Sequence, residues 1–187
     1  MKNIKKLIIS ALFAALCLVS TVFFAFPLPT GYANLGDCFA FMAGFVLGLP
    51  GIAAAGIGCA LADLVSGYAI YIPVTAVLKA LIALAGAISA RCLFRGQYKL
   101  LIRRLAVPIS SFLGEMIMVL GYFAYEYFII GVGEAAVVSL PANLGQAALG
   151  IVASVIIAGV FAKNHALSGF VSANVVGKNH DGSKGEK

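Results

Sequence analysis

Three ionisable side chains lie within long apolar stretches of this sequence, and they are the first candidates for chemistry or ligand binding. They are Asp63, Lys79 and Glu115. Placing a charged side chain at the centre of a bilayer costs about 2.5 to 3.5 kcal/mol, so such residues normally face a cavity or one another. Two interpretations therefore stay open for Lys79 and Asp63: contact with a bound ligand, or an ion pair that holds two helices together.

Amide and phenol side chains are expected at the same level as these charges. Asn143 and Gln146 are three residues apart and share one helix face, and a preceding loop contributes Asn34 and Asp37. The tyrosines of this region are Tyr68, Tyr71, Tyr122, Tyr125 and Tyr127. The set predicts a polar, aromatic-lined pocket that opens at one end of the protein. Tyr125 and Tyr127 suit an interfacial aromatic belt better, with a solvated Glu126 between them.

Enzymatic chemistry finds no support in the sequence. The H-E-x-x-H and G-x-S-x-G motifs are absent, and His165 and His180 lie near the C-terminus. Asp63, Glu115 and Lys79 could serve as acid and base, but no nucleophile accompanies them. The four cysteines have no C-x-x-C spacing and are expected to be small apolar fillers. We predict that the chain is not an enzyme, holds no metal or cofactor and has no nucleotide site of its own.

The elements that must position these residues are transmembrane helices. The chain is 62% hydrophobic and only 11% charged, whereas a soluble domain carries about a quarter charged residues. The apolar blocks approach the ~20 residues that a bilayer requires of a helix. The first block is too long for a signal peptide and is kept as a helix. The predicted helices are residues 7–26, 36–49, 51–68, 72–93, 105–128 and 141–162.

The charge pattern predicts how this all-α bundle of six transmembrane helices lies in the membrane. The N-terminal lysines and the basic stretch 91–104 should both be cytoplasmic, because positive loops stay inside. An even number of crossings must separate them, so Pro50-Gly51 is interpreted as a cytoplasmic turn between the second and third helices. Both termini are then cytoplasmic. Residues 1–163 are expected to form the membrane domain and residues 164–187 a polar, disordered cytoplasmic tail. The basic residues flank spans, so no nucleic-acid partner is needed.

The chain resembles the membrane-embedded substrate-binding (S) components of energy-coupling factor (ECF) vitamin transporters. The resemblance covers nearly the whole chain and rests on its length, its predicted six helices and a set of short motifs. These are Asn34-Leu35-Gly36-Asp37, Gly51 through Ala62-Asp63-Leu64 to Gly67-Tyr68, Pro73 with Lys79, and the Ala-x-x-x-Ala pair Ala11 and Ala15.

The resemblance implies a multi-pass protein of the prokaryotic cytoplasmic membrane that captures a vitamin or vitamin precursor from outside. Delivery would require a transmembrane scaffold (T) subunit, on which Ala11 and Ala15 would dock, and two ATPase subunits. The residues expected to bind substrate are Asn34, Tyr71, Lys79, Glu115, Tyr122, Asn143 and Gln146.

The identity of the ligand is left open by the residues. With Lys79 offset by Asp63 and Glu115, the pocket is expected to be near neutral or slightly acidic, which suits a small neutral or weakly basic ring. Pyridoxine or hydroxymethylpyrimidine is the first expectation, hydrogen-bonded by amides and Glu115 and stacked on Tyr71 or Tyr122. Riboflavin is the second and thiamin the third, since Trp, the best cation partner, is lacking.

Two non-enzymatic alternatives predict different behaviour. A small membrane scaffold or assembly subunit would pair its polar residues internally and bind no ligand. A solitary proton-coupled carrier working through Glu115 would transport without ATP or partner subunits.

Overall fold

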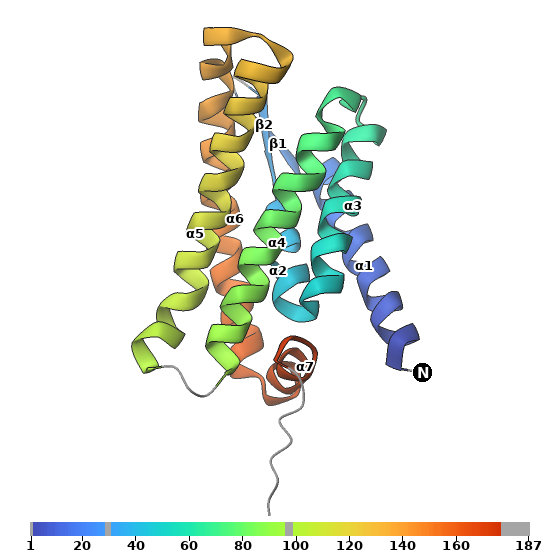
Figure 1. Cartoon of the computed structure of the whole chain (residues 1–187), viewed down its shortest axis with the longest axis vertical. Helices are drawn as coiled ribbons and strands as arrows, with labels where there is room; N and C mark the ends of the chain where they lie inside the picture. Colours follow the sequence, from blue (N-terminus) through green and yellow to red (C-terminus); the bar gives the residue numbers. More distant parts are fainter. Residues whose placement is uncertain (1, 29–30, 96–98, 177–187) are drawn as a thin grey trace, which may run out of the picture.

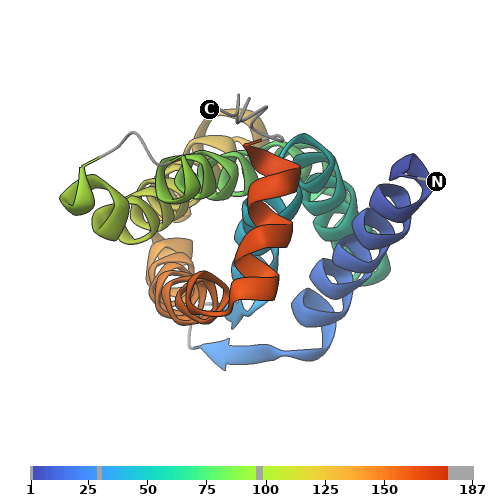
Figure 2. The ribbon, with the colours of Figure 1, turned by 90° about the horizontal axis from the view of Figure 1, so that it is seen from below.

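The computed structural model describes residues 2–28, 31–95 and 99–176 of the chain. Within these ranges six helices form a bundle and a seventh lies across one end (Figures 1 and 2). The elements are α1 (Lys2–Phe23), β1 (Ala25–Leu28), β2 (Gly31–Asn34), α2 (Gly36–Leu47), α3 (Leu49–Val65), the 3-10 helix η1 (Ala69–Tyr71), α4 (Ile72–Phe94), α5 (Leu100–Ala124), the π-helix η2 (Tyr125–Ile130), the 3-10 helix η3 (Gly133–Ser139), α6 (Leu140–Lys163) and α7 (His165–Val175).

The apolar exterior of the bundle is that of a membrane protein. Among the described residues, four helical segments are long and apolar enough to cross a bilayer: Ile4–Phe23, Ala69–Phe94, Leu100–Ile130 and Gly133–Lys163. Large apolar side chains such as Leu7, Leu113 and Val152 are exposed along these helices, where lipid would cover them. Because α2 and α3 are shorter, the expected number of six crossings remains a prediction.

The short helix α2 is the centre of the bundle. Every one of its residues except Phe39 is buried, and it contacts α1, α3, α4, α6 and α7. A helix that is apolar all round belongs inside a bundle rather than at its surface. Gly44 permits the closest approach, since a Cβ there would lie 1.7 Å from the carbonyl oxygen of Ala83 on α4. Small residues therefore let α2 and α4 pack backbone against backbone.

The junction between α2 and α3 is a tight turn, located slightly before the predicted position. Gly48 has a φ of 67°, in the left-handed region that favours glycine. Leu49 then begins α3, and Pro50 occupies its first turn, where the missing N–H of proline costs no helical hydrogen bond. Pro50 thus lies inside the start of α3 rather than at the break.

The segment expected to be a loop after α1 contains a β-hairpin. β1 and β2 pair antiparallel, with Ala25 opposite Asn34 and Leu28 opposite Gly31. β2 contacts α6 as well as α1, so the hairpin runs across the side of the bundle between these helices (Figure 2). The two strands satisfy each other's backbone groups, which is why a short segment leaving a helix can cross the bundle without helical structure.

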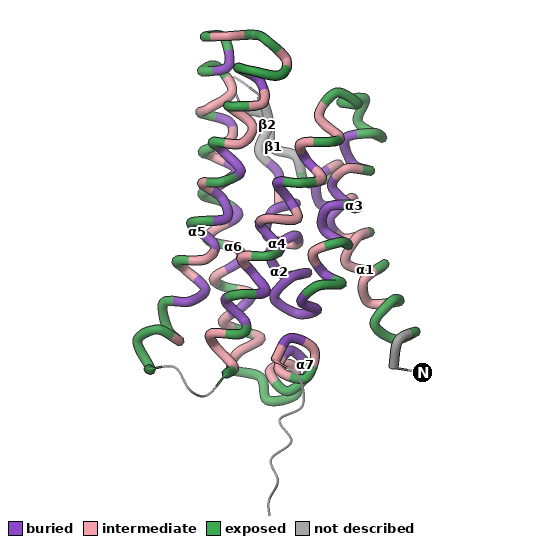
Figure 3. The backbone as a smooth tube through the Cα atoms, viewed as in Figure 1, coloured by how far each residue is buried: buried purple, intermediate pink, exposed green. Residues whose placement is uncertain are grey.

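The first part of the expected disordered tail is helical, which corrects that prediction for residues 165–175. The side chain of Asn164 caps α7 by accepting hydrogen bonds from the backbone N–H groups of Ala166 and Leu167, at 3.0 and 3.2 Å. Val171 and Val175, one turn apart, are buried against the bundle below α2 (Figures 1 and 3). The helix forms because its apolar residues lie on one face and fill the space below the short helix α2. Residues 177–187 lie outside the described residues.

We expect Val171→Asp to destabilise the protein, because it places a charge at a position with 0% exposure inside the apolar core. A loss of about 3 kcal/mol or more in the free energy of unfolding is the expected scale for an uncompensated buried charge, measured by denaturation in detergent. Ala173→Asp, on the exposed face of the same helix, is the matched control. Equal effects of the two changes would show that α7 does not pack on the bundle.

Candidate functional site

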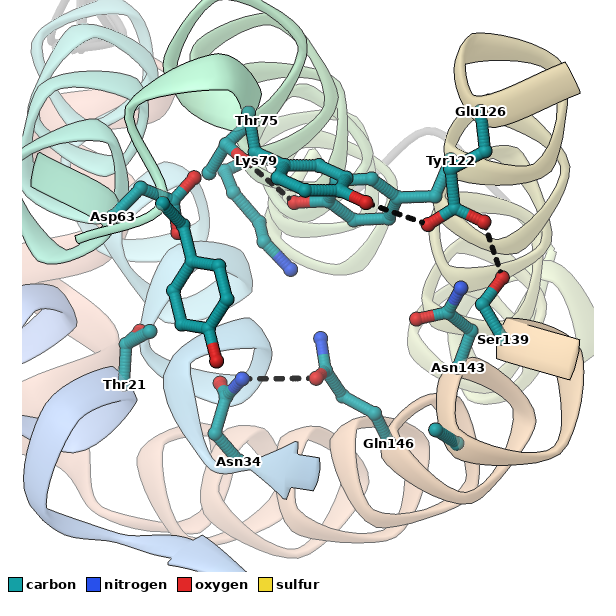
Figure 4. A pocket seen from close by; sticks show the side chains of 13 residues that line it. Thr21, Asn34, Asp63, Thr75, Lys79, Tyr122, Glu126, Ser139, Asn143 and Gln146 are labelled. Carbon is teal, nitrogen blue, oxygen red and sulfur yellow. Dashed lines mark hydrogen bonds between the residues drawn. The ribbon is translucent and has the colours of Figure 1, made fainter. Parts of the chain in front are cut away.

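A cavity of about 260 Å³ opens at the end of the bundle opposite α7. It lies between α3, α4, η2, α6 and the end of the hairpin, and its polar side chains converge on a common space (Figure 4). The lining residues are Thr21, Asn34, Asp63, Tyr68, Tyr71, Thr75, Lys79, Tyr122, Glu126, Ser139, Ala142, Asn143 and Gln146. The sequence-based expectation of a polar, aromatic-lined pocket matches this description.

Tyrosine rings form one wall of the cavity. The Tyr71 ring lies 6.4 Å from that of Tyr68 and 6.3 Å from that of Tyr122 between centroids, and both contacts are inclined rather than parallel, as aromatic pairs prefer. The Tyr122 hydroxyl is 2.8 Å from Oγ1 of Thr75, which fixes the ring. Tyr125 does not line the cavity; its hydroxyl donates to the backbone carbonyl of Ile70 at 2.6 Å and joins η2 to η1.

Amide side chains form the opposite side of the cavity near the hairpin. Nδ2 of Asn34 donates to Oε1 of Gln146 at 2.8 Å, and Oδ1 of Asn34 accepts from the backbone N–H of Gly36 at 2.8 Å. Nε2 of Gln146 donates in turn to Oδ2 of Asp37 at 2.5 Å. Asn143 lines the cavity three residues before Gln146 and makes no hydrogen bond within the described part of the chain. Its amide is therefore available to a ligand.

Lys79 pairs with Asp37, not with Asp63 as the ion-pair hypothesis assumed. The Lys79 ammonium donates to Oδ1 of Asp37, and the two side chains are 3% and 0% exposed. Asp37 lies in the first turn of the buried helix α2, facing α4, whereas Asp63 lies in the last turns of α3. Asp37 was expected where a loop enters the predicted helix 36–49, and Asp63 was the partner considered for Lys79.

Glu115 lies deeper than the cavity and does not line it, although the sequence analysis expected it to contact substrate. It is 1% exposed, and a Cβ added at Gly150 would strike its carboxylate. Gly150 is one helical turn further along α6 than Gln146, so Glu115 lies below the amides. Neither of its carboxylate oxygens has a hydrogen-bond partner among the described residues. Asp37 and Lys79 are charged residues that interact with it electrostatically.

Glu126 lines the cavity instead of being solvated at the interface, which corrects that expectation. It is buried and accepts hydrogen bonds from the hydroxyls of Tyr71, at 3.2 Å, and Ser139, at 2.5 Å. The π-helical turn η2 directs it inward, and such turns are frequent at functional sites. Thr21, Thr75 and Ser139 are further lining residues that sequence reasoning missed, because single hydroxyls on apolar helices give no distinctive signal.

The ion pair can be located by a double-mutant cycle. Asp37→Asn or Lys79→Gln alone should lower the free energy of unfolding by about 3 to 5 kcal/mol, because each leaves an uncompensated buried charge. The double variant should lose clearly less than the sum. Denaturation in detergent supplies the measurement. The parallel cycle with Asp63→Asn is the control; strong coupling there and none with Asp37 would contradict the observed pairing.

An apolar helical bundle that holds a preformed cavity of this kind defines a membrane-embedded protein that binds a small molecule. Residues 1–163 match the family model described as ECF-type riboflavin transporter, S component. The chain belongs to this family: it is the substrate-capture subunit of a vitamin transporter and not an enzyme. No curated protein and no solved structure gave a significant match. The family match confirms the resemblance drawn from the sequence, and α7 lies beyond the matched region.

Proposed function

We propose that this chain captures riboflavin, or a flavin with the same ring system, from the extracellular side of a prokaryotic cytoplasmic membrane and delivers it to the cytoplasm. The observation that carries the proposal is the cavity, in which tyrosine rings face amide side chains. A flavin ring is planar and aromatic, and its pyrimidine edge carries an N–H donor between two carbonyl acceptors. The free amide of Asn143 and the fixed amides of Asn34 and Gln146 supply complementary groups.

Riboflavin replaces pyridoxine or hydroxymethylpyrimidine as the first candidate ligand. The description of the matched family names riboflavin, and the tyrosine wall formed by Tyr68, Tyr71 and Tyr122 extends over three rings. A single small ring would leave part of that wall without a partner. Pyridine and pyrimidine vitamins and thiamin are the ligands against which riboflavin has to be compared.

The proposed orientation has six crossings, α1 to α6, and both termini in the cytoplasm. The start of α1, the end of α4, the start of α5, and α7 all lie at the end of the bundle opposite the cavity (Figure 1). Lys5, Lys6, Arg91 and Arg103 belong to these segments. The positive-inside rule places this end in the cytoplasm, so the cavity faces outward. The predicted cytoplasmic tail would then consist of α7 and the residues after it.

Delivery is proposed to depend on a transmembrane scaffold subunit and two ATPase subunits, because the chain carries no nucleotide-binding motif of its own. Helix α1 is the natural docking element. It lies at the edge of the bundle (Figure 2), and Ala11 and Ala15 are exposed one turn apart on its outer surface. Two small residues at this spacing let a helix of another subunit approach closely.

Riboflavin should be released when the purified protein is denatured, and mass spectrometry should identify it. Titration of the ligand-free protein, followed by flavin fluorescence, should then show saturable binding that Asn143→Leu weakens at least tenfold, or about 1.4 kcal/mol. Because Asn143 makes no hydrogen bond to the described chain, this change should leave folding intact. Leu144→Ala, at an exposed position on the same helix, is the control. A folded protein without saturable vitamin binding would support the scaffold alternative.

The double change Ala11→Leu/Ala15→Leu should leave flavin binding unchanged and abolish uptake in cells that contain the energising subunits, since bulky side chains would block docking. Uptake of labelled riboflavin is the measurement. Ala148→Leu, an exposed alanine on α6, is the matched control and should transport normally. Uptake that persists without ATP and without partner subunits would favour the solitary carrier.

A further inference from the structure

Acidic groups surround the cavity, and one basic group accompanies them. Away from the cavity, the basic residues in the described part of the chain lie on the first turns of α1, around the α4–α5 connection and at the end of α6. The acidic residues beside or beyond the cavity are Asp37, Asp63, Glu115, Glu126 and Glu134, and the basic residue among them is Lys79. Even with Glu115 uncharged, negative charge exceeds positive charge in this half of the bundle.

The positive charge of Lys79 is already compensated before any ligand enters. Its ammonium forms the ion pair with Asp37 and lies 5.5 Å from the centroid of the Tyr122 ring. Oδ2 of the same Asp37 side chain is held by Gln146, so the carboxylate cannot turn away without breaking a second bond. A ligand in the cavity therefore meets a neutralised lysine.

Asp63 is the acidic residue that presents one unengaged oxygen to the cavity, although Thr75 and Lys79 also act on its carboxylate. It is 7% exposed and lines the cavity, yet its Oδ2 has no hydrogen-bond partner within the described ranges. Figure 4 shows it across the cavity from Glu126, whose oxygens are engaged by Tyr71 and Ser139. A buried acceptor without a donor is costly, so binding is favoured for a molecule that brings a donor to Asp63.

We infer that Asp63 is a specificity-determining residue, which makes the cavity select neutral or cationic ligands that carry hydrogen-bond donors and reject anionic ones. This inference rests on the proposed function, and it predicts that the chain binds riboflavin more tightly than the phosphate ester of riboflavin. The hydroxyl groups of the riboflavin side chain donate to Asp63. A phosphate brings a charge of about −1.5 to −2 at neutral pH into a cavity with acids on two opposite walls.

The test compares riboflavin with its phosphate ester, flavin mononucleotide, on the purified full chain by fluorescence titration at neutral pH. The wild-type protein should bind the phosphate ester at least tenfold more weakly than riboflavin. Asp63→Asn should narrow this ratio at least threefold. Thr21→Val, which removes an uncharged hydroxyl that also lines the cavity, should change both affinities by a similar factor and leave the ratio as it is.

Equal affinity of the wild-type protein for the two flavins would overturn the inference while leaving the proposed function intact. The comparison of the two flavins on the wild-type protein tests the inference even if the Asp63→Asn variant does not fold. A wild-type preference that Asp63→Asn leaves unchanged would also overturn the role of Asp63. The released ligand separates the two proposals. A neutral or cationic molecule that is not a flavin would contradict the flavin assignment and support the charge selection. A released phosphorylated flavin would support the flavin assignment and contradict the charge selection.

Discussion

The ion pair between Asp37 and Lys79 is the interaction on which the arrangement of the cavity end of the bundle depends. It joins the buried helix α2 to α4 at the base of the cavity, and both charges are removed from water. Such a pair is stable only if its remaining hydrogen-bonding groups are satisfied. Gln146 supplies that bond from α6 and also holds Asn34 at the end of the hairpin. One connected set of polar groups thus fixes α2, α4, α6 and β2 relative to one another.

The same network links the cavity to the packing of α2, α4, α6 and β2. Asn34 and Gln146 line the cavity and also belong to the network, so a ligand that hydrogen-bonds them reinforces the attachment of β2 to α6. Without a ligand, Oδ2 of Asp63 has no hydrogen-bond donor among the described residues. Occupancy should therefore tighten the cavity end of the bundle, where a capture subunit must hold its ligand before delivery. The preformed network keeps the cost of ordering these side chains on binding low.

Sequence reasoning found the membrane class, the long helices and most of the cavity because these depend on local properties. Apolar block length reveals spans, and Asn143 and Gln146 share a face by helical spacing alone. It considered only Asp63 as an ion-pair partner for Lys79, since which of two acids faces a lysine depends on how α2 rotates within the bundle. It also missed the inward turn of Glu126, because a π-helical turn arises from packing and leaves no periodic pattern. The capped helix α7 was overlooked for a similar reason. Its short apolar face is stabilised only by packing below α2, and this contact cannot be read from the local sequence.

The length of α2 connects these features. Its 12 residues span ~18 Å, whereas the apolar core of a bilayer is ~30 Å thick, so a central helix of this length leaves ~12 Å of the bundle axis to be filled. At one end of the bundle α7 occupies the space, packing Val171 and Val175 where a longer helix would continue. At the other end the space is left as the cavity, with Asp37 in the first turn of α2 facing its base. A longer α2 would replace the polar base with apolar side chains and leave Lys79 without its partner. The shortness of the central helix is therefore what makes room for a ligand inside an otherwise close-packed bundle.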